Sequence, residues 1–310
     1  MIGADKMKSS LKTTYLLLLF VMMAWGFNVS AISVLVNEIE PVLLTSIRVF
    51  MAGVVVLIIT RIFKVFRIPT KAEMKVILYI TIFNVIIHHL FLALGLSYTS
   101  GINAGAILGF GPVLTMIMSV IFLKNRMTPL RITGFFIGFL GVFIATSLSN
   151  GLSINLSVGD LFIFICILAQ AYSFILISKM QPSLDTRLLT GYMMIIGSTV
   201  IFIFNLFTKP NFSELSKLVE PRLLLVFIFS AVVCTALGHM IYNNAIKKVG
   251  AAESAIFINL NTFFAVIGAS LFLGEAIKLV HVIGLLFILL GVFVGTGALE
   301  EWMKRRGRVR

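Results

Sequence analysis

Long apolar segments follow one another along almost the whole chain, with short polar stretches between them. Each segment is close to the roughly 20 residues that an α-helix needs to cross a hydrocarbon core of about 30 Å. The strict polar–apolar alternation that is typical of membrane β-strands is absent from them. The pattern therefore predicts an all-α membrane protein with ten transmembrane helices, at residues 13–36, 42–62, 76–96, 102–123, 130–148, 161–178, 188–207, 223–243, 254–273 and 280–299.

One pair of apolar segments occurs twice along the chain. The residues at 122–123 and 140–143 (Phe-Leu and Leu-Gly-Val-Phe) recur 150 positions later at 272–273 and 290–293. This repeat predicts two five-helix domains, at residues 1–150 and 151–310, the second of which ends in a basic tail. Membrane chains that are duplicated internally often hold a solute site between the two copies, near the middle of the bilayer.

Composition and charge fit this pattern. Hydrophobic residues make up 59% of the chain and charged residues only 12%, far below the charged share of a soluble domain. The net charge of +13 comes from Lys and Arg that cluster in alternate loops, which indicates membrane topology and argues against nucleic-acid binding. With a cytoplasmic N-terminus, only Lys209, Lys217, Arg222 and Lys278 lie outside. Both termini are then cytoplasmic, and because five is an odd number, the second repeat is inverted relative to the first.

Ionisable side chains are costly in hydrocarbon, so those within the predicted spans are candidate functional residues. All 12 Asp and Glu lie in loops or at span ends, which leaves Arg48, His88, His89 and His239. His89 and His239 are 150 positions apart, so the repeat predicts that they face one cavity, where an imidazole can exchange a proton near neutral pH. A neutral histidine that only links two helices is the alternative. His88 is expected on a different face of its helix.

Arg48 lies about two turns into the second predicted span. A long basic side chain in such a place can reach the membrane interface, and this or a purely structural use is the favoured interpretation. The alternative is a guanidinium that binds a substrate carboxylate or fixes a neighbouring helix.

Uncharged polar residues within the spans supply the rest of the predicted substrate site. Amides, hydroxyls and an indole can hydrogen-bond a small solute, although amides inside membranes also link helices. Two glycines and a proline interrupt the fourth span and predict a conformational hinge at Gly109, Gly111 and Pro112, with a plain packing kink as the equally compatible alternative. With the histidine pair, the predicted substrate-binding residues are Trp25, Asn28, Asn84, His89, Gln170, Tyr172, His239, Tyr242, Asn243, Asn259 and Asn261.

A second set of glycines lies in the fifth and tenth predicted spans. Small residues spaced along a membrane helix let a neighbouring helix approach closely. Close packing is therefore expected at Gly134, Gly138, Gly141, Gly284 and Gly291.

Motifs for enzyme chemistry or metal binding do not accompany the polar residues. The sequence has no HExxH or CxxC pair, nucleophile elbow or phosphate loop. Cys166 and Cys234 both fall within apolar spans, where a free thiol behaves as a small apolar group. The sequence therefore predicts neither an enzyme nor a bound metal or cofactor.

Several motifs carry a resemblance to a known family through their order along the chain. They are the residues at 24–28 (Ala-Trp-Gly-Phe-Asn), Arg48, the stretch 98–112, and the duplicated pattern at 122–143 and 272–293. Together they make the chain similar to the EamA family of ten-helix transporters in the drug/metabolite transporter superfamily. The resemblance covers roughly residues 13–299, so it implies that each predicted domain is an EamA-type repeat.

The resemblance implies a plasma-membrane carrier that exports small metabolites, such as amino acids or related compounds, by alternating access. Its central cavity would be lined by the first, third, fourth, sixth, eighth and ninth helices, while the fifth and tenth are associated with dimer or scaffold packing. A homodimer is thus an open alternative to a monomer. The family often has a Glu-Pro pair in the ninth helix, mirroring Ser-Pro in the fourth, but here these positions read Asn261-Thr262 and Gly111-Pro112. The chain lacks that carboxylate.

The sequence as a whole predicts a multi-pass secondary transporter whose partners are a small-molecule substrate and the lipid bilayer. The alternative is a non-transporting membrane scaffold that uses the same helices for contacts with lipid or other proteins. Polar and aromatic side chains recognise many small molecules, so the sequence leaves open the solute, the direction of transport and any coupling ion.

Overall fold

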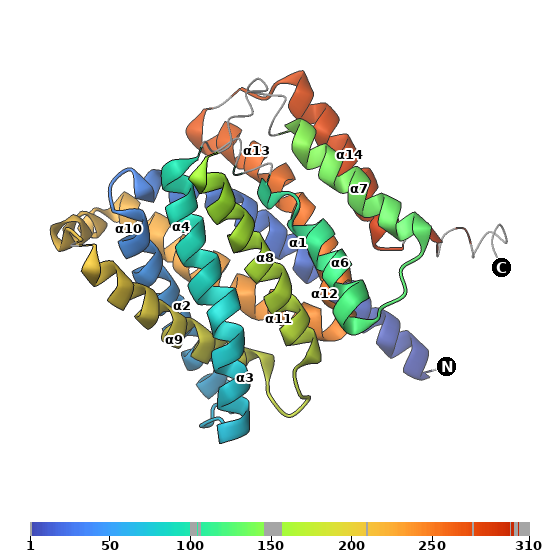
Figure 1. The fold of residues 1–310 in the computed structure, drawn as a ribbon, viewed down its shortest axis with the longest axis horizontal. Coiled ribbons are helices and arrows are strands. Elements are labelled where there is room, and N and C mark those ends of the chain that lie inside the picture. Colours follow the sequence, from blue (N-terminus) through green and yellow to red (C-terminus); the bar gives the residue numbers. More distant parts are fainter. Residues whose placement is uncertain are drawn as a thin grey trace.

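The computed structural model consists of helices joined by short loops (Figure 1). It describes residues 2–99, 104, 107–145, 157–208, 210–274, 276–297, 299–300 and 303, and every regular element in these ranges is helical. Within them, seven segments are long and apolar enough to cross a membrane: Leu11–Val36, Pro41–Ile62, Lys71–Tyr98, Val158–Lys179, Thr186–Phe207, Pro221–Val249 and Ala251–Leu273. Three shorter apolar helices are Gly111–Leu123, Pro129–Phe143 and Leu279–Gly295. The prediction of an all-helical, multi-pass membrane protein is confirmed.

Each predicted span overlaps one of these segments, although the three shorter helices do not reach the length of a full crossing within the described residues. The first residues of the predicted fourth span, 102–103, and the basic tail at 304–310 lie outside the described residues. The seven full-length segments therefore support the spans predicted from hydropathy more directly than the three shorter helices do.

Proline and short polar side chains fix where several helices begin. Pro41 and Pro129 lie in the first turns of α2 (Pro41–Ile62) and α7 (Pro129–Phe143), where the missing proline N–H is no loss. Thr70 and Ser157 form capping boxes at α3 (Lys71–Thr81) and α8 (Val158–Lys179). The remaining α-helices are α1 (Ile2–Val36), α4 (His88–Tyr98), α6 (Gly111–Leu123), α9 (Thr186–Phe207), α10 (Pro221–Ile228), α11 (Gly238–Val249), α12 (Ala251–Ala255), α13 (Asn259–Leu273) and α14 (Leu279–Gly295), and η3 (Phe212–Val219) and η5 (Ile256–Ile258) are short 3₁₀-helices.

Two of the membrane segments contain a π-helix. The segment η1 (Ile82–Ile87) joins α3 to α4, and η4 (Phe229–Leu237) joins α10 to α11. His89 follows the end of η1 by two residues, and His239 follows the end of η4 by the same number. A π-helix is rare and widens the helical turn, which changes the residues that share a face before and after it.

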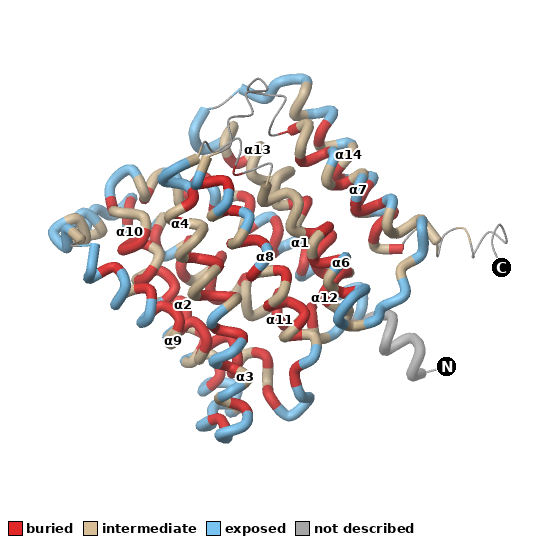
Figure 2. The backbone as a smooth tube through the Cα atoms, in the orientation of Figure 1, coloured by how far each residue is buried: buried red, intermediate tan, exposed pale blue. Residues whose placement is uncertain are grey.

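Helix packing pairs elements from the two parts of the chain. α2 packs against α9 and α7 against α14, while α1 lies beside α13 and α8 beside α6. α4 also contacts α8, and α1 contacts α11. The buried positions run through the middle of the central helices, whereas α7 and α14 form a pair at one edge of the molecule (Figures 1 and 2).

Glycines bring α7 and α14 into backbone contact, as the sequence predicts. A Cβ atom added at Gly134 would lie 2.3 Å from the Gly295 nitrogen, and one added at Gly291 would lie 2.4 Å from the Gly138 nitrogen. Gly141 likewise faces the backbone of α14. The expectation of close packing at these positions is confirmed.

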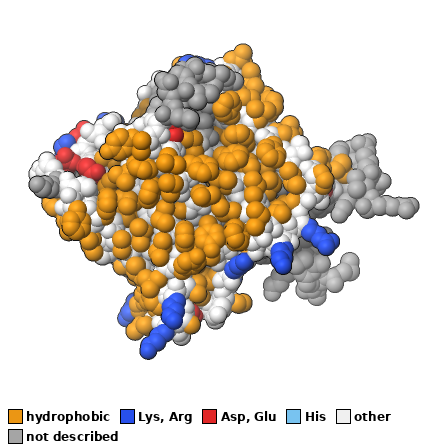
Figure 3. Space-filling view, viewed as in Figure 1, with side chains coloured by type: hydrophobic (Ala, Val, Ile, Leu, Met, Phe, Trp, Pro, Cys, Tyr) orange, Lys and Arg blue, Asp and Glu red, His pale blue; other side chains and the backbone are white. Residues whose placement is uncertain are grey.

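The surface is largely apolar between its charged ends. Leu16, Ile58 and Phe207 are among many exposed large hydrophobic residues. Figure 3 shows hydrophobic side chains over most of the visible face, with most of its Lys and Arg along the lower edge. An apolar surface of this extent suits lipid contact and would be a liability in water.

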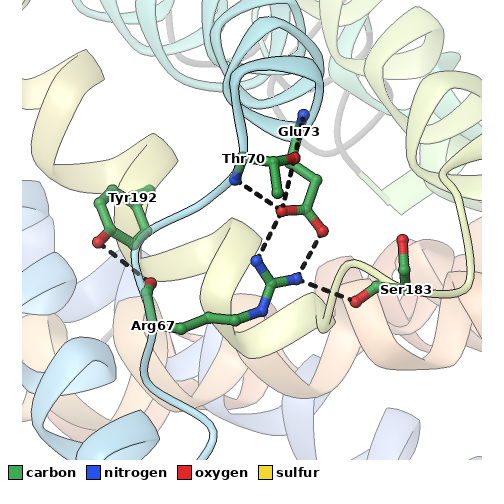
Figure 4. A network of polar contacts seen from close by, with 5 residues as sticks. All are labelled: Arg67, Thr70, Glu73, Ser183 and Tyr192. Carbon is green, nitrogen blue, oxygen red and sulfur yellow. Dashed lines mark hydrogen bonds and ion pairs between the residues drawn. The ribbon is translucent and has the colours of Figure 1, made fainter.

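A polar network fixes the loop before α3 (Figure 4). Arg67 donates both terminal nitrogens to the Glu73 carboxylate, at 2.6 and 2.5 Å, and also donates to the Ser183 carbonyl at 3.2 Å. The Tyr192 hydroxyl donates to the Arg67 carbonyl at 3.4 Å. The hydrogen bonds with Glu73 raise the pKa of Arg67 above its ordinary value. The network thus ties the α2–α3 loop to the α8–α9 loop and to α9.

Glu40 caps α2 and links it to α9. Its carboxylate accepts from the Val42 and Leu43 nitrogens at 3.0 and 2.6 Å and from the Asn205 amide at 3.0 Å. The Glu40→Ala variant is therefore expected to lose about 1–2 kcal/mol of unfolding free energy. The midpoint of thermal unfolding in detergent measures this loss. Glu220→Ala is the matched control, since Glu220 precedes α10 without a side-chain cap bond; equal shifts in the two variants would contradict the prediction.

Candidate functional site

The two histidines that the repeat places in matching positions meet inside the bundle. The ring centroids of His89 on α4 and His239 on α11 are 6.1 Å apart. His89 is 6% exposed, and its Nδ1 atom has no hydrogen-bond partner. Nδ1 of His239 lies 2.9 Å from the Thr235 carbonyl oxygen, so it carries the proton in this contact. The structure brings the pair together, as the sequence spacing predicts.

Trp25 on α1 packs over the second histidine. Its ring centroid lies 5.0 Å from that of His239 and 5.2 Å from that of Tyr242. The indole Nε1 donates to the Cys234 carbonyl in η4 at 2.8 Å. The space for the indole depends on Gly238, where an added Cβ would lie 2.5 Å from Trp25 Nε1. The π-helix thus supplies the hydrogen-bond acceptor for Trp25, and the glycine after it leaves space for the indole.

His88 extends the cluster toward α8 and so lies on a different face of its helix from His89, which meets His239 on α11. Its ring lies 4.8 Å from that of His89. The Gln170 amide donates to His88 Nε2 at 3.1 Å, and His88 Nδ1 lies 3.1 Å from Cys166 Sγ. The imidazole is thus held by α8 on one side and by its neighbour on the other.

Asn84 in η1 completes the link between the third segment and α8. Its amide donates to the Ser173 hydroxyl at 2.8 Å, and that hydroxyl donates to the Gln170 carbonyl at 2.7 Å. Neither Ser173 nor Cys166 was singled out from the sequence, because small polar side chains occur throughout membrane helices.

Arg48 does not reach the membrane interface, so the interpretation of a snorkelling side chain is wrong. It is 6% exposed, and Nη1 donates to the Thr235 hydroxyl in η4 at 2.6 Å. The same Thr235 carries the carbonyl that faces His239. Arg48 therefore borders the histidine cluster. Its place within an apolar span is the reason that the sequence analysis counts it among the candidate functional residues.

Several buried polar atoms of the described cluster lack a partner. They include Nδ1 of His89, Oδ1 of Asn84 and the hydroxyl of Tyr242. A buried polar atom without a hydrogen bond costs about 1–3 kcal/mol. Such atoms suit water or a polar solute that can supply the missing bonds. We refer to Trp25, Asn84, His88, His89, Gln170, His239 and Tyr242 as the central cluster.

Three further predicted site residues make their described contacts with other helices, and their part in substrate binding stays a prediction. Tyr172 contacts Tyr79, and their hydroxyls are 3.3 Å apart. Asn243 donates to the Thr190 hydroxyl of α9 at 2.9 Å. Asn259 faces α7, since a Cβ at Gly138 would lie 2.4 Å from its amide nitrogen. The hydrogen bonds of Tyr172 and Asn243 link helices, which is the alternative role of polar groups in membranes. Both amide atoms of Asn259, in contrast, are buried without a hydrogen-bond partner.

Asn28 and Asn261 lie on α1 and α13, which pack together. Both carry a buried oxygen without a hydrogen-bond partner. The predicted hinge falls at the start of α6: Gly109 and Phe110 form a turn, and Pro112 lies in the first helical turn. Because residues 107–108 before the turn are also helical, the helical segment is interrupted where the sequence predicts, and a hinge motion at this point stays a prediction.

A cavity of about 550 Å³ lies at one end of the bundle and away from the central cluster. The α6–α7 loop, the end of α8 and the α11–α12 junction line it, and its polar side chains are Asn125, Arg126, Arg131, Ser178 and Glu253. Arg131 forms an ion pair with Glu253 at 2.8 Å. The polar lining suits an aqueous opening.

The fold and the cluster together define a multi-pass helical membrane protein with a polar centre. The chain belongs to the EamA-like transporter family, whose model matches residues 12–147 and 157–296. Its similarity to transporters extends to individual proteins. It is 32% identical over 211 residues to the uncharacterized transporter YyaM of Bacillus subtilis (strain 168), which covers 66% of this chain and 68% of that protein.

Two further comparisons cover more of the chain. An uncharacterized transporter of Archaeoglobus fulgidus is 25% identical over 270 residues, or 87% of this chain and 94% of that protein. A solved crystal structure has a TM-score of 0.76 and 15% identity and covers 93% of this chain and 97% of its own. The likeness to that structure concerns the fold alone.

Proposed function

We propose that this chain is a secondary transporter that exports a small metabolite, an amino acid or a related compound, across the plasma membrane. Transport would proceed by alternating access through a central site between two inverted five-helix repeats, with both termini in the cytoplasm. The central cluster carries this proposal. It joins buried polar groups from α1, α4, α8 and α11, near the middle of membrane segments, and leaves several of their atoms without partners.

The pattern of helix contacts supports the proposed repeat. In the proposed repeat, α1, α2, α4, α6 and α7 correspond to α8, α9, α11, α13 and α14. The contact of α1 with α13 then corresponds to that of α8 with α6, and the contact of α4 with α8 corresponds to that of α11 with α1. The α2–α9 and α7–α14 pairs each join two corresponding helices. The two π-helices also fall in matching segments. The two stretches matched by the family model lie on either side of the predicted boundary at residue 150.

The cavity beside Arg131 supports an opening on the basic side of the membrane. The ion pair of Arg131 with Glu253, and its 3.4 Å contact with Glu300, join the proposed first repeat to the second. The Thr128 hydroxyl also donates to Glu300. Rocking of the repeats would have to rearrange these contacts, which are partly exposed and therefore weak enough to change.

Flux of small solutes in proteoliposomes tests the proposal directly. Purified protein should release loaded amino acids or related metabolites, while protein-free liposomes should not. If the folded protein moves no small solute, the scaffold alternative is favoured instead. Size-exclusion chromatography of the protein recovered from the liposomes establishes that it remained folded.

A double substitution tests whether the histidine pair links transport to protons. The His89→Gln/His239→Gln variant is expected to lose the dependence of flux on a pH gradient, because glutamine keeps hydrogen bonding but does not titrate near neutral pH. His281→Gln is the matched control, since His281 lies at the exposed start of α14. If the double variant keeps the pH dependence of the unmodified protein, the pair has no role in coupling, and facilitated diffusion becomes the better description.

A further inference from the structure

Arg48 is a buried cation whose observed hydrogen-bond partner is neutral. Its guanidinium has five N–H donors in a planar fork, and Nη1 donates to the Thr235 hydroxyl at 2.6 Å. None of the ion pairs among the described residues includes Arg48. The described part of the chain thus provides a hydroxyl at this point but no carboxylate in an ion pair.

Several carboxylates of the described residues are engaged at helix ends. Glu40 and Asp185 cap α2 and α9, Asp160 belongs to the capping box of α8, and Glu73 and Glu253 form ion pairs with other arginines. Arg48 lies well inside its helix, so these groups do not neutralise it. A buried charge without a partner is strongly destabilising. Among the described residues, no carboxylate forms an ion pair with this guanidinium, so an anion from outside the chain would supply the missing charge.

The central cluster lies directly beside this guanidinium. Thr235 accepts from Arg48 through its hydroxyl and faces His239 through its carbonyl. The ring centroid of His239 lies 5.0 Å from that of Trp25 and 6.1 Å from that of His89. A solute that pairs with Arg48 would thus place its remaining atoms against aromatic rings and against unpaired polar atoms such as Nδ1 of His89.

We propose that Arg48 binds the anionic group of the transported solute, and that the solute is a small carboxylate with an apolar or aromatic portion. The fork of a guanidinium matches the two oxygens of a carboxylate, which pairs with it in a bidentate manner. The rings of Trp25 and His239 would receive the apolar portion. This inference rests on the proposed transport function and adds the charge of the substrate to it.

Competition between matched solutes tests the inference. Proteoliposomes are loaded with equal amounts of the common L-amino acids and their C-terminal amides, and release is followed by mass spectrometry. Each amide keeps the shape of the acid but removes its negative charge. The unmodified protein is expected to release acids about 10- to 100-fold faster than the matching amides, which is the range for one charge-assisted hydrogen bond. Arg48→Gln is expected to reduce this preference to near one.

Two further variants separate substrate binding from a structural role. Thr235→Val removes the visible partner of Arg48 but keeps its charge, so the preference for acids should persist. Arg48→Lys keeps the charge without the fork and should raise the KM for the acids while retaining the preference. If the unmodified protein releases amides as fast as acids, the inference is wrong even where Arg48→Gln does not fold. If the unmodified protein releases neither, the proposed transport of amino acids fails instead.

Discussion

Replacing Gly291 with alanine is expected to push α7 away from α14 and to lower the unfolding free energy by about 1–3 kcal/mol. The added Cβ would lie 2.4 and 2.5 Å from the backbone nitrogen and Cα of Gly138 and 2.8 Å from the Gly134 carbonyl oxygen. All three neighbours are backbone atoms, so no side chain can rotate to make room. The two helices must therefore separate, and the whole α7–α14 pair loses contact area.

The midpoint of thermal unfolding in detergent measures this effect. Gly111→Ala is the matched control, because Gly111 is also helical but an added Cβ there would meet nothing within 4 Å. Alanine has the higher helix propensity, so this control should be neutral or slightly stabilising. Similar losses in both variants would show that the close approach of α7 and α14 does not limit stability.

Replacing Gly238 with alanine is expected to cost about 1–3 kcal/mol and to abolish most transport. The new Cβ would lie 2.5 Å from Trp25 Nε1 and would drive the indole from its bond with the Cys234 carbonyl. That carbonyl would be left unpaired inside the protein, which adds to the cost. The displaced ring would also leave His239 and Tyr242, so the central cluster would lose its α1 component.

A double-mutant cycle identifies the cause of this loss. If the clash with the indole is responsible, Gly238→Ala should cost much less in a Trp25→Leu background than in the unmodified protein. Solute flux and the midpoint of thermal unfolding are measured for all members of the cycle. Additive effects on stability would mean that Gly238 acts through the helix backbone and not through Trp25.

The same positions explain how the two proposed repeats differ at the site. In the proposed repeat, Ala169 corresponds to Trp25 at a spacing of 144 residues, and Gly238 corresponds to His88 at a spacing of 150. On one side a large ring from α1 packs over a glycine, whereas on the other His88 projects toward α8 and contacts Gln170. One side thus pairs the large Trp25 with the small Gly238, and the other side has the small Ala169 and the large His88. The two proposed repeats would thus form an asymmetric cluster, which would suit the recognition of an asymmetric solute.

Sequence reasoning succeeded where hydrophobicity and spacing alone decide the outcome. The membrane segments follow from hydropathy, because a span without water must bond its own backbone groups and therefore forms a helix. The meeting of His89 and His239 follows from their spacing in the repeat. The glycines of α7 and α14 follow from the need for small residues where helices touch.

The sequence by itself thus determined an all-helical membrane protein, the positions of most segments and the pair of histidines. Only the tertiary structure decided which polar side chains join them. It placed Tyr172, Asn243 and Asn259 in contact with other helices and brought Arg48 and His88 into the central cluster or beside it. The physical reason is that membrane helices are apolar on most faces, so periodicity does not mark the inward side, and the π-helices shift the residues that share a face.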